Sequence, residues 1–122
     1  MLLTRVLPLL VAALLALAPA ARAGDPGFRV MSYNIRVDVP TDNPTWVERR
    51  PHMAAQIAFH DPDILGVQEA HSAMVGYLAE RLPAYDRYGL GRDDGGPVGE
   101  TTTLFWNRDR FEALRTRTFW CS

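Results

Sequence analysis

Two polar residues stand where two predicted strands end, and both are of types that bind metal ions. Asn34 lies near the end of an alternating segment over residues 28–36, and Glu69 closely follows the short apolar run at residues 64–67. If these strands are neighbours in register, both side chains reach the same edge of the sheet. Amide and carboxylate oxygens suit Mg²⁺, or another divalent cation such as Mn²⁺ or Ca²⁺. We therefore predict that Asn34 and Glu69 are catalytic residues and metal ligands.

Each of these two residues also has a simpler explanation, which the sequence leaves open. An asparagine near a strand end is ordinarily part of a turn, and a charged residue after an apolar strand ordinarily faces solvent. The hypothesis of a metal site therefore depends on the two side chains meeting in the fold.

A glycine-rich loop over residues 91–100 carries one guanidinium group and three carboxylates. Arg92 can hold a phosphate group through two parallel hydrogen bonds, which predicts a substrate-binding role. Glu100 can orient a histidine that acts as general base, which predicts a catalytic role. The alternatives are a surface ion pair of Arg92 with Asp93 or Asp94, and simple solvation of Glu100.

Other catalytic chemistries find little support in the sequence. His52, His60 and His71 lie beside predicted helix ends, and none has metal-ligand spacing to a cysteine or to another histidine. No serine lies in a Gly-x-Ser-x-Gly pattern. Cys121 is the one cysteine, so no internal disulfide is expected. Covalent catalysis is therefore disfavoured.

The elements that would position the candidate residues alternate between strands and helices. We predict a helix beginning at Pro51, because proline has no N–H and suits a first helical position, and we interpret residues 45–48 as a separate turn. Ser72 is expected to cap a second helix, whose apolar stripe ends at Leu82. The predicted strands cover residues 28–36, 64–67, 85–90, 101–106 and 111–120.

This order of elements predicts an α/β fold of the α+β type, with a mixed sheet and helices on one face. The last predicted strand ends in large aromatic residues at Phe119 and Trp120. Such a strand leaves an apolar face and an unpaired edge, which a complete domain covers. We therefore expect further protein to follow residue 122.

Length and charge limit the function classes. The 122 residues hold 13 basic and 14 acidic side chains and allow one domain at most. All of the basic residues are arginines scattered among acids, so nucleic acid is a possible partner that the charge does not indicate. Residues 1–23 have the pattern of a signal peptide cleaved after Ala23, with a retained anchor as the alternative. We expect a secreted or periplasmic protein whose domain covers residues 24–122, without a stable membrane anchor.

Two segments of the sequence, when they occur together, are characteristic of one protein family. Met-Ser-Tyr-Asn-Ile-Arg at residues 31–36, followed by Asp-Pro-Asp-Ile-Leu-Gly-Val-Gln-Glu at residues 61–69, resembles the endonuclease/exonuclease/phosphatase family, the deoxyribonuclease I-like superfamily. The resemblance continues through residues 91–95, 99–100 and 118–120. It covers only the first half of the family's length.

The resemblance implies the N-terminal half of a four-layer αββα sandwich, with a metal-dependent site that hydrolyses phosphate esters. Asn34 is similar to the family's first-strand asparagine near metal and phosphate, and Glu69 to its metal-binding glutamate. Glu100 is similar to the acid that hydrogen-bonds a catalytic histidine in deoxyribonuclease-type members. Arg92 precedes it in the loop and is expected to face the substrate.

The later motifs of the family are absent from this sequence, including an Asp-x-Asn pair, an active-site histidine and a terminal Ser-Asp-His. We therefore expect an exported Mg²⁺-dependent phosphoesterase that is truncated and has little or no activity as this fragment. The alternatives are a noncatalytic binding module or degenerate fragment on the same fold, and a two-carboxylate glycosidase based on Glu69 and Glu100. The sequence does not choose between nucleic acid, lipid head group and small phosphate ester as substrate, and it does not indicate an oligomeric state.

Overall fold

A computed structural model describes residues 27–120 of the chain. The expected signal peptide over residues 1–23, its cleavage site, and Cys121 lie outside the described residues. Within residues 27–120, neither helix is long and apolar enough to cross a membrane.

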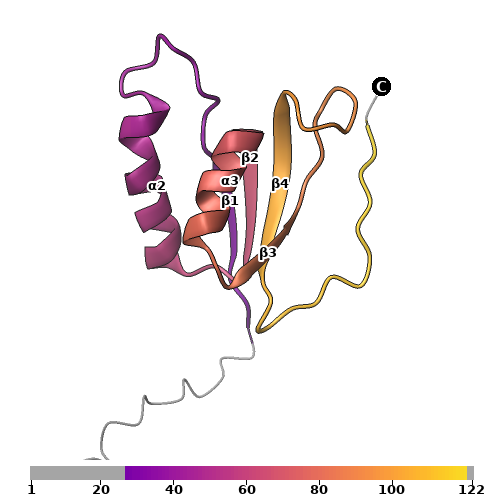
Figure 1. The fold of residues 1–122 in the computed structure, drawn as a ribbon. Coiled ribbons are helices and arrows are strands. Elements are labelled where there is room, and N and C mark those ends of the chain that lie inside the picture. The colour runs from indigo at the N-terminus through magenta and orange to yellow at the C-terminus, as the bar shows by residue number, and fades with distance from the viewer. Residues whose placement is uncertain (1–26, 121–122) are drawn as a thin grey trace, which may run out of the picture.

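The described chain alternates strands and helices and then ends in two strands (Figure 1). Its elements in chain order are β1 (Val30–Asn34), α2 (Trp46–His60), β2 (Ile64–His71), α3 (Ser72–Arg81), β3 (Tyr85–Tyr88) and β4 (Glu100–Asn107).

The strands form one mixed sheet in the order β1-β2-β4-β3. β1 and β2 are parallel, whereas β4 is antiparallel to both of its neighbours, β2 and β3. The predicted α/β class with a mixed sheet is therefore confirmed. The parallel register places Asn34 opposite Gln68, so the last residue of β1 lies beside the residue that precedes Glu69.

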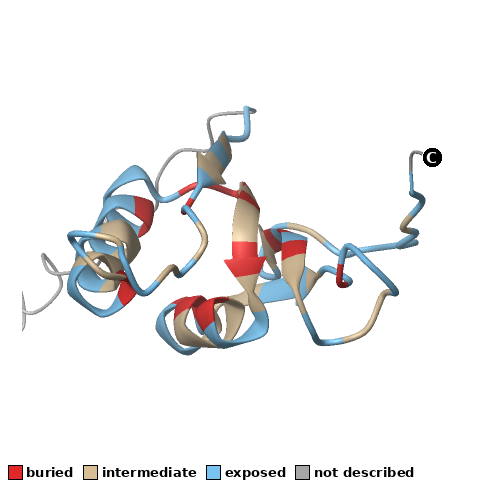
Figure 2. Ribbon diagram, turned by 90° about the horizontal axis from the view of Figure 1, so that it is seen from above, coloured by how far each residue is buried: buried red, intermediate tan, exposed pale blue. Residues whose placement is uncertain are grey.

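The core lies between the sheet and the two helices, which cover the same face of it (Figures 1 and 2). The sheet contributes Leu65, Val67 and Phe105, all without solvent exposure, and the helices contribute Ile57 and Leu78. These positions follow the period of two expected of a strand with one covered face. The helical layer thus fixes which strand residues point inward.

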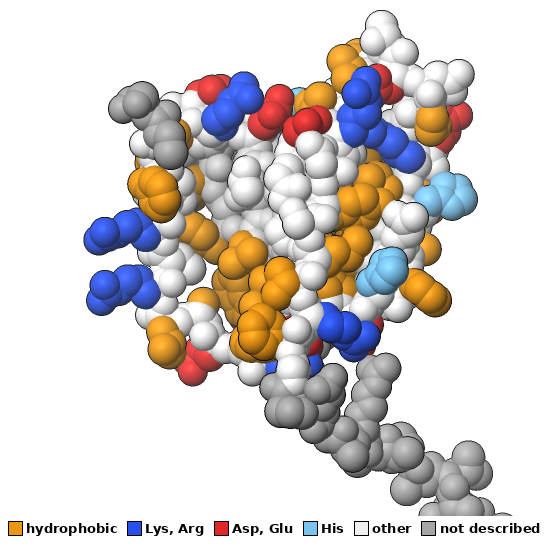
Figure 3. All heavy atoms as spheres, turned by 180° about the vertical axis from the view of Figure 1, so that it is seen from behind, with side chains coloured by type: hydrophobic (Ala, Val, Ile, Leu, Met, Phe, Trp, Pro, Cys, Tyr) orange, Lys and Arg blue, Asp and Glu red, His pale blue; other side chains and the backbone are white. Residues whose placement is uncertain are grey.

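The opposite face of the sheet is open in the described part of the chain. Hydrophobic side chains gather on its lower half (Figure 3), where Ile64, Leu104 and Trp106 line a shallow apolar groove with residues of the 111–117 segment. The described residues form one sheet and one helical layer. The four-layer sandwich that the resemblance implies therefore stays a prediction.

The first helix begins five residues earlier than predicted. α2 starts at Trp46, and Pro51 lies inside it. The Glu48 carboxylate accepts hydrogen bonds from the Thr45 N–H at 2.8 Å and from Thr45 Oγ1 at 2.7 Å. These bonds cap the N-terminus of the helix. This cap, with the burial of the Trp46 ring, offsets the one backbone hydrogen bond that Pro51 cannot donate.

Two further boundaries differ from the prediction by short distances. β2 continues past Val67 to His71, through an irregularity between Val67 and Ala70. The cap position of α3 is His71, and Ser72 is the first residue inside the helix. The Ser72 hydroxyl donates instead to the carbonyl oxygen of Pro97 in the glycine-rich loop.

The fifth predicted strand is wrong, because residues 111–120 form no regular element. The composition of this segment favours a strand, but a strand also needs a neighbour with which it shares backbone hydrogen bonds. The hydrogen bonds found near its end come from side chains: Thr118 Oγ1 donates to the Tyr88 hydroxyl at 3.2 Å, and Trp120 Nε1 donates to the Arg92 carbonyl. The segment runs beside the sheet without extending it.

Candidate functional site

The structure brings Asn34 and Glu69 together at one edge of the sheet. Asn34 Nδ2 donates a hydrogen bond of 2.7 Å to Glu69 Oε1. The contact joins the end of β1 to the middle of β2, two strands that pair in parallel. The geometric condition on which the predicted metal site depends is therefore met, and the roles of the two residues remain to be tested.

A β-bulge gives Glu69 its outward position. Leu65 and Val67 point into the core, so strict alternation would point Glu69 inward as well. Between Val67 and Ala70, β2 contains one residue more than the facing part of β4, since Val67 pairs with Thr103 and Ala70 with Thr101. The extra residue lets Ala70 take the inward position and leaves Glu69 at the edge.

The backbone of Glu69 is strained to achieve this. Its φ of 59° lies in the left-handed region, which a residue with a side chain adopts at a cost of about 1–3 kcal/mol. Such strain persists where the surrounding structure holds it, and it occurs often at functional sites. The strained bulge is therefore a second observation, besides the hydrogen bond from Asn34, that supports Glu69 as a candidate functional residue.

Backbone groups after β1 complete the surroundings of the carboxylate. Glu69 Oε2 accepts the Val37 N–H at 3.2 Å, and Asn34 Oδ1 accepts the Arg36 N–H at 2.8 Å. The hydrogen bond from Asn34, followed by that from the Val37 N–H, holds the pKa of Glu69 below its usual value. The side chain is thus an oriented carboxylate anion near neutral pH.

The two hydrogen bonds of the Asn34 side chain limit the roles that it can have. Its amide nitrogen faces Glu69 and its oxygen faces a backbone N–H, so the amide orients the carboxylate directly. A carbonyl oxygen has a second lone pair, which leaves one position on Oδ1 for a cation.

The predicted residues of the glycine-rich loop lie in a pocket with Glu69. The pocket has a volume of about 210 Å³, and Glu69, Arg92, Glu100 and Trp120 are among its lining residues. Acidic side chains between basic ones mark the upper rim of the open sheet face in Figure 3. The structure therefore places all four predicted site residues in one region, since Asn34 contacts Glu69 directly.

Arg92 and Glu100 contact each other across the base of their loop. The Arg92 N–H donates to the Glu100 carbonyl at 2.9 Å, and Arg92 Nη1 donates to Glu100 Oε2 at 3.3 Å. The Arg92 guanidinium also lies 3.6 Å from the Asp93 carboxylate. The ion-pair alternative for Arg92 is thus present in the structure, and it leaves other guanidinium N–H groups able to bind an anion.

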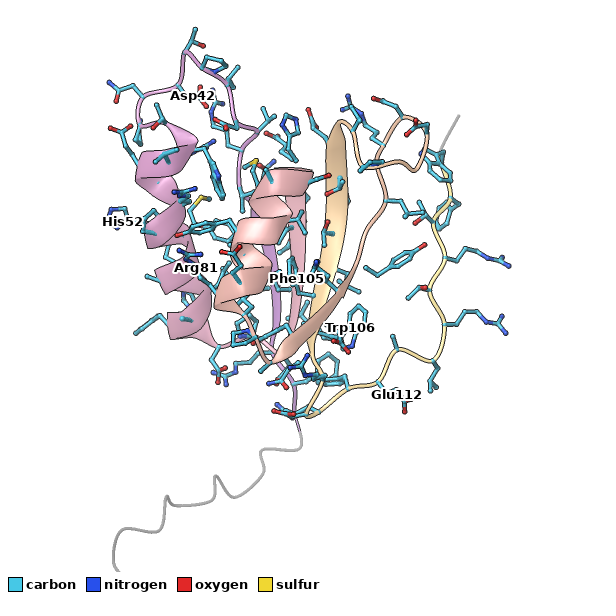
Figure 4. All side chains as sticks on the ribbon, viewed as in Figure 1. Asp42, His52, Arg81, Phe105, Trp106 and Glu112 are labelled. Carbon is cyan, nitrogen blue, oxygen red and sulfur yellow. The ribbon has the colours of Figure 1, made fainter. Side chains whose placement is uncertain are left out.

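The histidines lie outside this pocket. His71 is the residue opposite Glu100 in the β2–β4 ladder, but it does not line the pocket, and no hydrogen bond joins the two side chains in the described chain. His52 points away from the sheet on the outer side of α2 (Figure 4), and the His60 ring packs edge-on against Phe59. Residues 27–120 thus show no histidine aligned by Glu100.

Sequence reasoning missed three charged residues next to the site. Arg36 donates to both oxygens of Asp42 at 2.7 and 2.6 Å, and Arg49 Nη2 donates to the carbonyl oxygens of Arg36 and Val37. Asp42 lies in the loop above α2 (Figure 4). The interpretation of residues 45–48 as a turn leaves Arg49 outside any helix, whereas in a helix that starts at residue 46 the spacing of Trp46 and Arg49 puts them on one face.

The fit of the candidate site to a metal ion rests on its oxygen donors. Residues 27–120 contain no group of three His, Cys, Asp or Glu side chains able to hold a metal ion. The oxygen donors present, Glu69 and the free position on Asn34 Oδ1, fit Mg²⁺, which keeps several waters and often takes only one or two carboxylates.

Comparisons with known proteins point to one family. No family model and no curated protein matches the chain. Among solved structures, an endonuclease/exonuclease/phosphatase from Bacteroides vulgatus is 38% identical with a TM-score of 0.68. It matches 72% of this chain and 34% of its own.

Two structures from Bacteroides thetaiotaomicron agree with this match. An endonuclease/exonuclease/phosphatase family protein is 36% identical with a TM-score of 0.69, over 72% of this chain and 32% of its own. A mannosyl-6-phosphatase has the same identity and TM-score, over 73% of this chain and 34% of its own. This chain thus spans about a third of the length of each of these structures. The resemblance first drawn from the two sequence strings is confirmed, and the chain carries part of an endonuclease/exonuclease/phosphatase family domain.

Proposed function

We propose that this chain is part of an exported, metal-dependent phosphoesterase in which Glu69 binds a divalent cation, with Mg²⁺ as the first candidate. The observation that carries the proposal is the 2.7 Å hydrogen bond between Asn34 and Glu69 at a strained bulge. A carboxylate that faces a pocket and is held by an amide and a backbone N–H is arranged as a ligand of a hard cation would be.

Each candidate site residue then has a distinct role. When bound, the cation would withdraw charge from a phosphate oxygen and stabilise the charge that develops during hydrolysis. Asn34 holds Glu69 in position and offers one oxygen lone pair. Arg92 binds the phosphate through its exposed guanidinium, and Glu100 holds that guanidinium at the rim. Glu100 can also support a general base from a part of the domain that this chain does not contain.

The substrate we favour is a phosphate ester of a small molecule. One matching structure is described as a mannosyl-6-phosphatase. The pocket is small, at about 210 Å³, and Phe119 and Trp120 form an aromatic part of its wall. The net charge of −1 does not favour a nucleic-acid backbone. A binding screen of phosphomonoesters and phosphodiesters with added Mg²⁺ would identify the class.

Binding is the primary test, because the later family motifs are absent from this sequence and we expect little or no turnover. Mn²⁺ serves as a paramagnetic probe in a titration of the 122-residue protein. We expect saturable binding by the wild type and a loss of affinity of about tenfold or more in Glu69→Gln. Glu112→Gln is the matched control, because Glu112 is exposed in the irregular 111–120 segment, outside the candidate pocket (Figure 4).

Three results would contradict parts of the proposal. Equal Mn²⁺ affinity in wild type and Glu69→Gln would remove Glu69 as the ligand. Metal binding that depends on Glu69, without metal-dependent binding of any phosphate ester, would favour the noncatalytic module for this chain. Metal-independent cleavage of a glycoside would favour the two-carboxylate glycosidase.

A further inference from the structure

Arg49 occupies an enclosed position in the first turn of α2. Its side chain is 13% exposed, and its guanidinium carbon lies 5.7 Å from the centre of the Trp46 ring. Its Nε is buried and has no hydrogen-bond partner among the described residues. Burying an unsatisfied donor is unfavourable, so the contacts of the remaining guanidinium nitrogens must offset that penalty.

Those contacts go to the backbone that follows β1. Arg49 Nη2 donates to the Arg36 carbonyl at 2.8 Å and to the Val37 carbonyl at 3.0 Å. The segment they hold is strained, because Arg36 has a φ of 56° in the left-handed region. Charged hydrogen bonds to two successive carbonyls are therefore well placed to hold this turn in its unusual conformation.

The same turn supplies the hydrogen bonds that orient the candidate ligand. The Val37 N–H binds Glu69 Oε2 at 3.2 Å, and the Arg36 N–H binds Asn34 Oδ1 at 2.8 Å. The Arg49 guanidinium on α2 thus binds the carbonyl oxygens of Arg36 and Val37. The N–H groups of the same two residues bind Asn34 and Glu69.

Asp42 supports the arrangement from the loop. It accepts both short hydrogen bonds from Arg36, and its other nearby cation is Arg49, whose Nη2 lies 3.9 Å away. Asp42 is 10% exposed, whereas Arg36 is 63% exposed. Asp42 and Arg49 therefore form an ion pair that is mostly shielded from solvent, and the exposed Arg36 side chain lies on its solvent side.

We infer that Arg49 is a positioning residue, which acts through the Arg36–Val37 turn to hold the Glu69 carboxylate in the conformation that binds the cation. It does not line the candidate pocket with Glu69. The effect on cation binding rests on the proposed function, but the effect on the turn does not. Partners that orient a metal ligand typically change metal affinity by about 10- to 100-fold when removed.

The test compares Arg49→Met with Arg49→Lys in the 122-residue protein. Methionine keeps an apolar stem against Trp46 and removes every donor, whereas lysine keeps a cation with donors that can reach a carbonyl. Arg50→Met is the matched control, since Arg50 lies next along α2 and stacks on the Tyr77 ring at 4.6 Å. The readouts are the Val37 amide signal in NMR without metal, its hydrogen exchange, the Mn²⁺ affinity and the melting temperature.

The proposal expects a selective effect. In Arg49→Met, the Val37 amide signal shifts and exchanges about tenfold faster or more, while amides of the β2 and β4 core keep their protection. Mn²⁺ affinity falls by about tenfold or more, Arg49→Lys recovers part of both losses, and Arg50→Met changes neither.

The other outcomes overturn the proposal or separate it from the proposed function. An unchanged Val37 amide in folded Arg49→Met would overturn it, and so would loss of the folded state in both Arg49 variants, which would assign Arg49 to stability alone. If wild type binds no Mn²⁺ but Val37 responds as expected, the proposed function fails and the positioning of Glu69 by Arg49 stands.

Discussion

Glu69 and Arg92 line the same pocket, but the structure holds them in different ways. Glu69 accepts a 2.7 Å hydrogen bond from Asn34 and a second one from a backbone N–H, and its backbone is strained. The Arg92 side chain is 67% exposed, and its hydrogen bond to Glu100 is 3.3 Å long. The sheet half of the site is held by several hydrogen bonds, whereas the loop half is exposed and held by one long hydrogen bond and an ion pair.

This difference follows from the elements that carry the two residues. Glu69 belongs to a strand with a neighbour on each side, and Arg92 belongs to a loop with several glycines. A group held in a sheet is suited to a ligand of fixed geometry, such as a cation, and a group on a loop can adapt to a substrate. We therefore expect the sheet half to determine metal binding and the loop half to determine phosphate binding.

The largest expected effect that tests this comparison is that of Asn34→Ala. Losing the hydrogen bond to Glu69 Oε1 should lower Mn²⁺ affinity by about 10- to 100-fold, measured by titration. Ser32→Ala is the control, because Ser32 lies two residues earlier on β1 and makes only a weak 3.4 Å contact with Gln68. If both variants bind Mn²⁺ as wild type does, Glu69 does not depend on its amide partner.

A smaller effect concerns the pH dependence of the sheet half. The pKa of Glu69 in the folded protein is lowered from 4.5 mainly by Asn34, so ionisation of this carboxylate stabilises the fold above pH 4.5. That contribution is lost as the pH falls through the lowered folded value. In Asn34→Ala we expect the pKa of Glu69 to move back toward 4.5, as measured by NMR titration of its side-chain carbonyl. An equally low value in the variant would assign the shift to other groups.

The smallest effect is expected from Arg92→Gln. Stability should change by less than about 0.5 kcal/mol, because the side chain is mostly exposed. Mn²⁺ affinity should stay close to that of wild type, while binding of inorganic phosphate in the presence of the metal weakens. Arg117→Gln, on the exposed 111–120 segment, controls for the loss of one positive charge. A fall in metal affinity as large as that of Asn34→Ala would remove the distinction between the two halves.

The fold class could be predicted because it depends on patterns of short range, whereas the meeting of Asn34 and Glu69 could be predicted only on the condition that the two strands are neighbours. An alternating segment and a short apolar run were enough to predict two strands, and parallel strands end at the same edge of a sheet. The outward direction of Glu69 was not predictable, because it depends on a bulge that only the pairing of β2 with β4 reveals.

Other features depended on contacts that local sequence does not encode. The start of α2 at Trp46 follows from a cap and from burial that outweigh the proline rule. Residues 111–120 have the composition of a strand, and in the described chain they pair with none. Arg49 binds backbone carbonyl oxygens, which every residue has. No pattern of residue types in the sequence therefore predicts this contact.

Paramagnetic broadening by Mn²⁺ can show directly whether the cation binds at Glu69. Mn²⁺ is added at low ratio to the isotope-labelled protein, and the loss of NMR signal is followed residue by residue. We expect the Asn34 side-chain amide and the Val37 backbone amide to broaden first, because both hydrogen-bond Glu69. Broadening centred on the acidic residues Asp93 and Asp94, with Asn34 and Val37 unaffected, would contradict cation binding at Glu69.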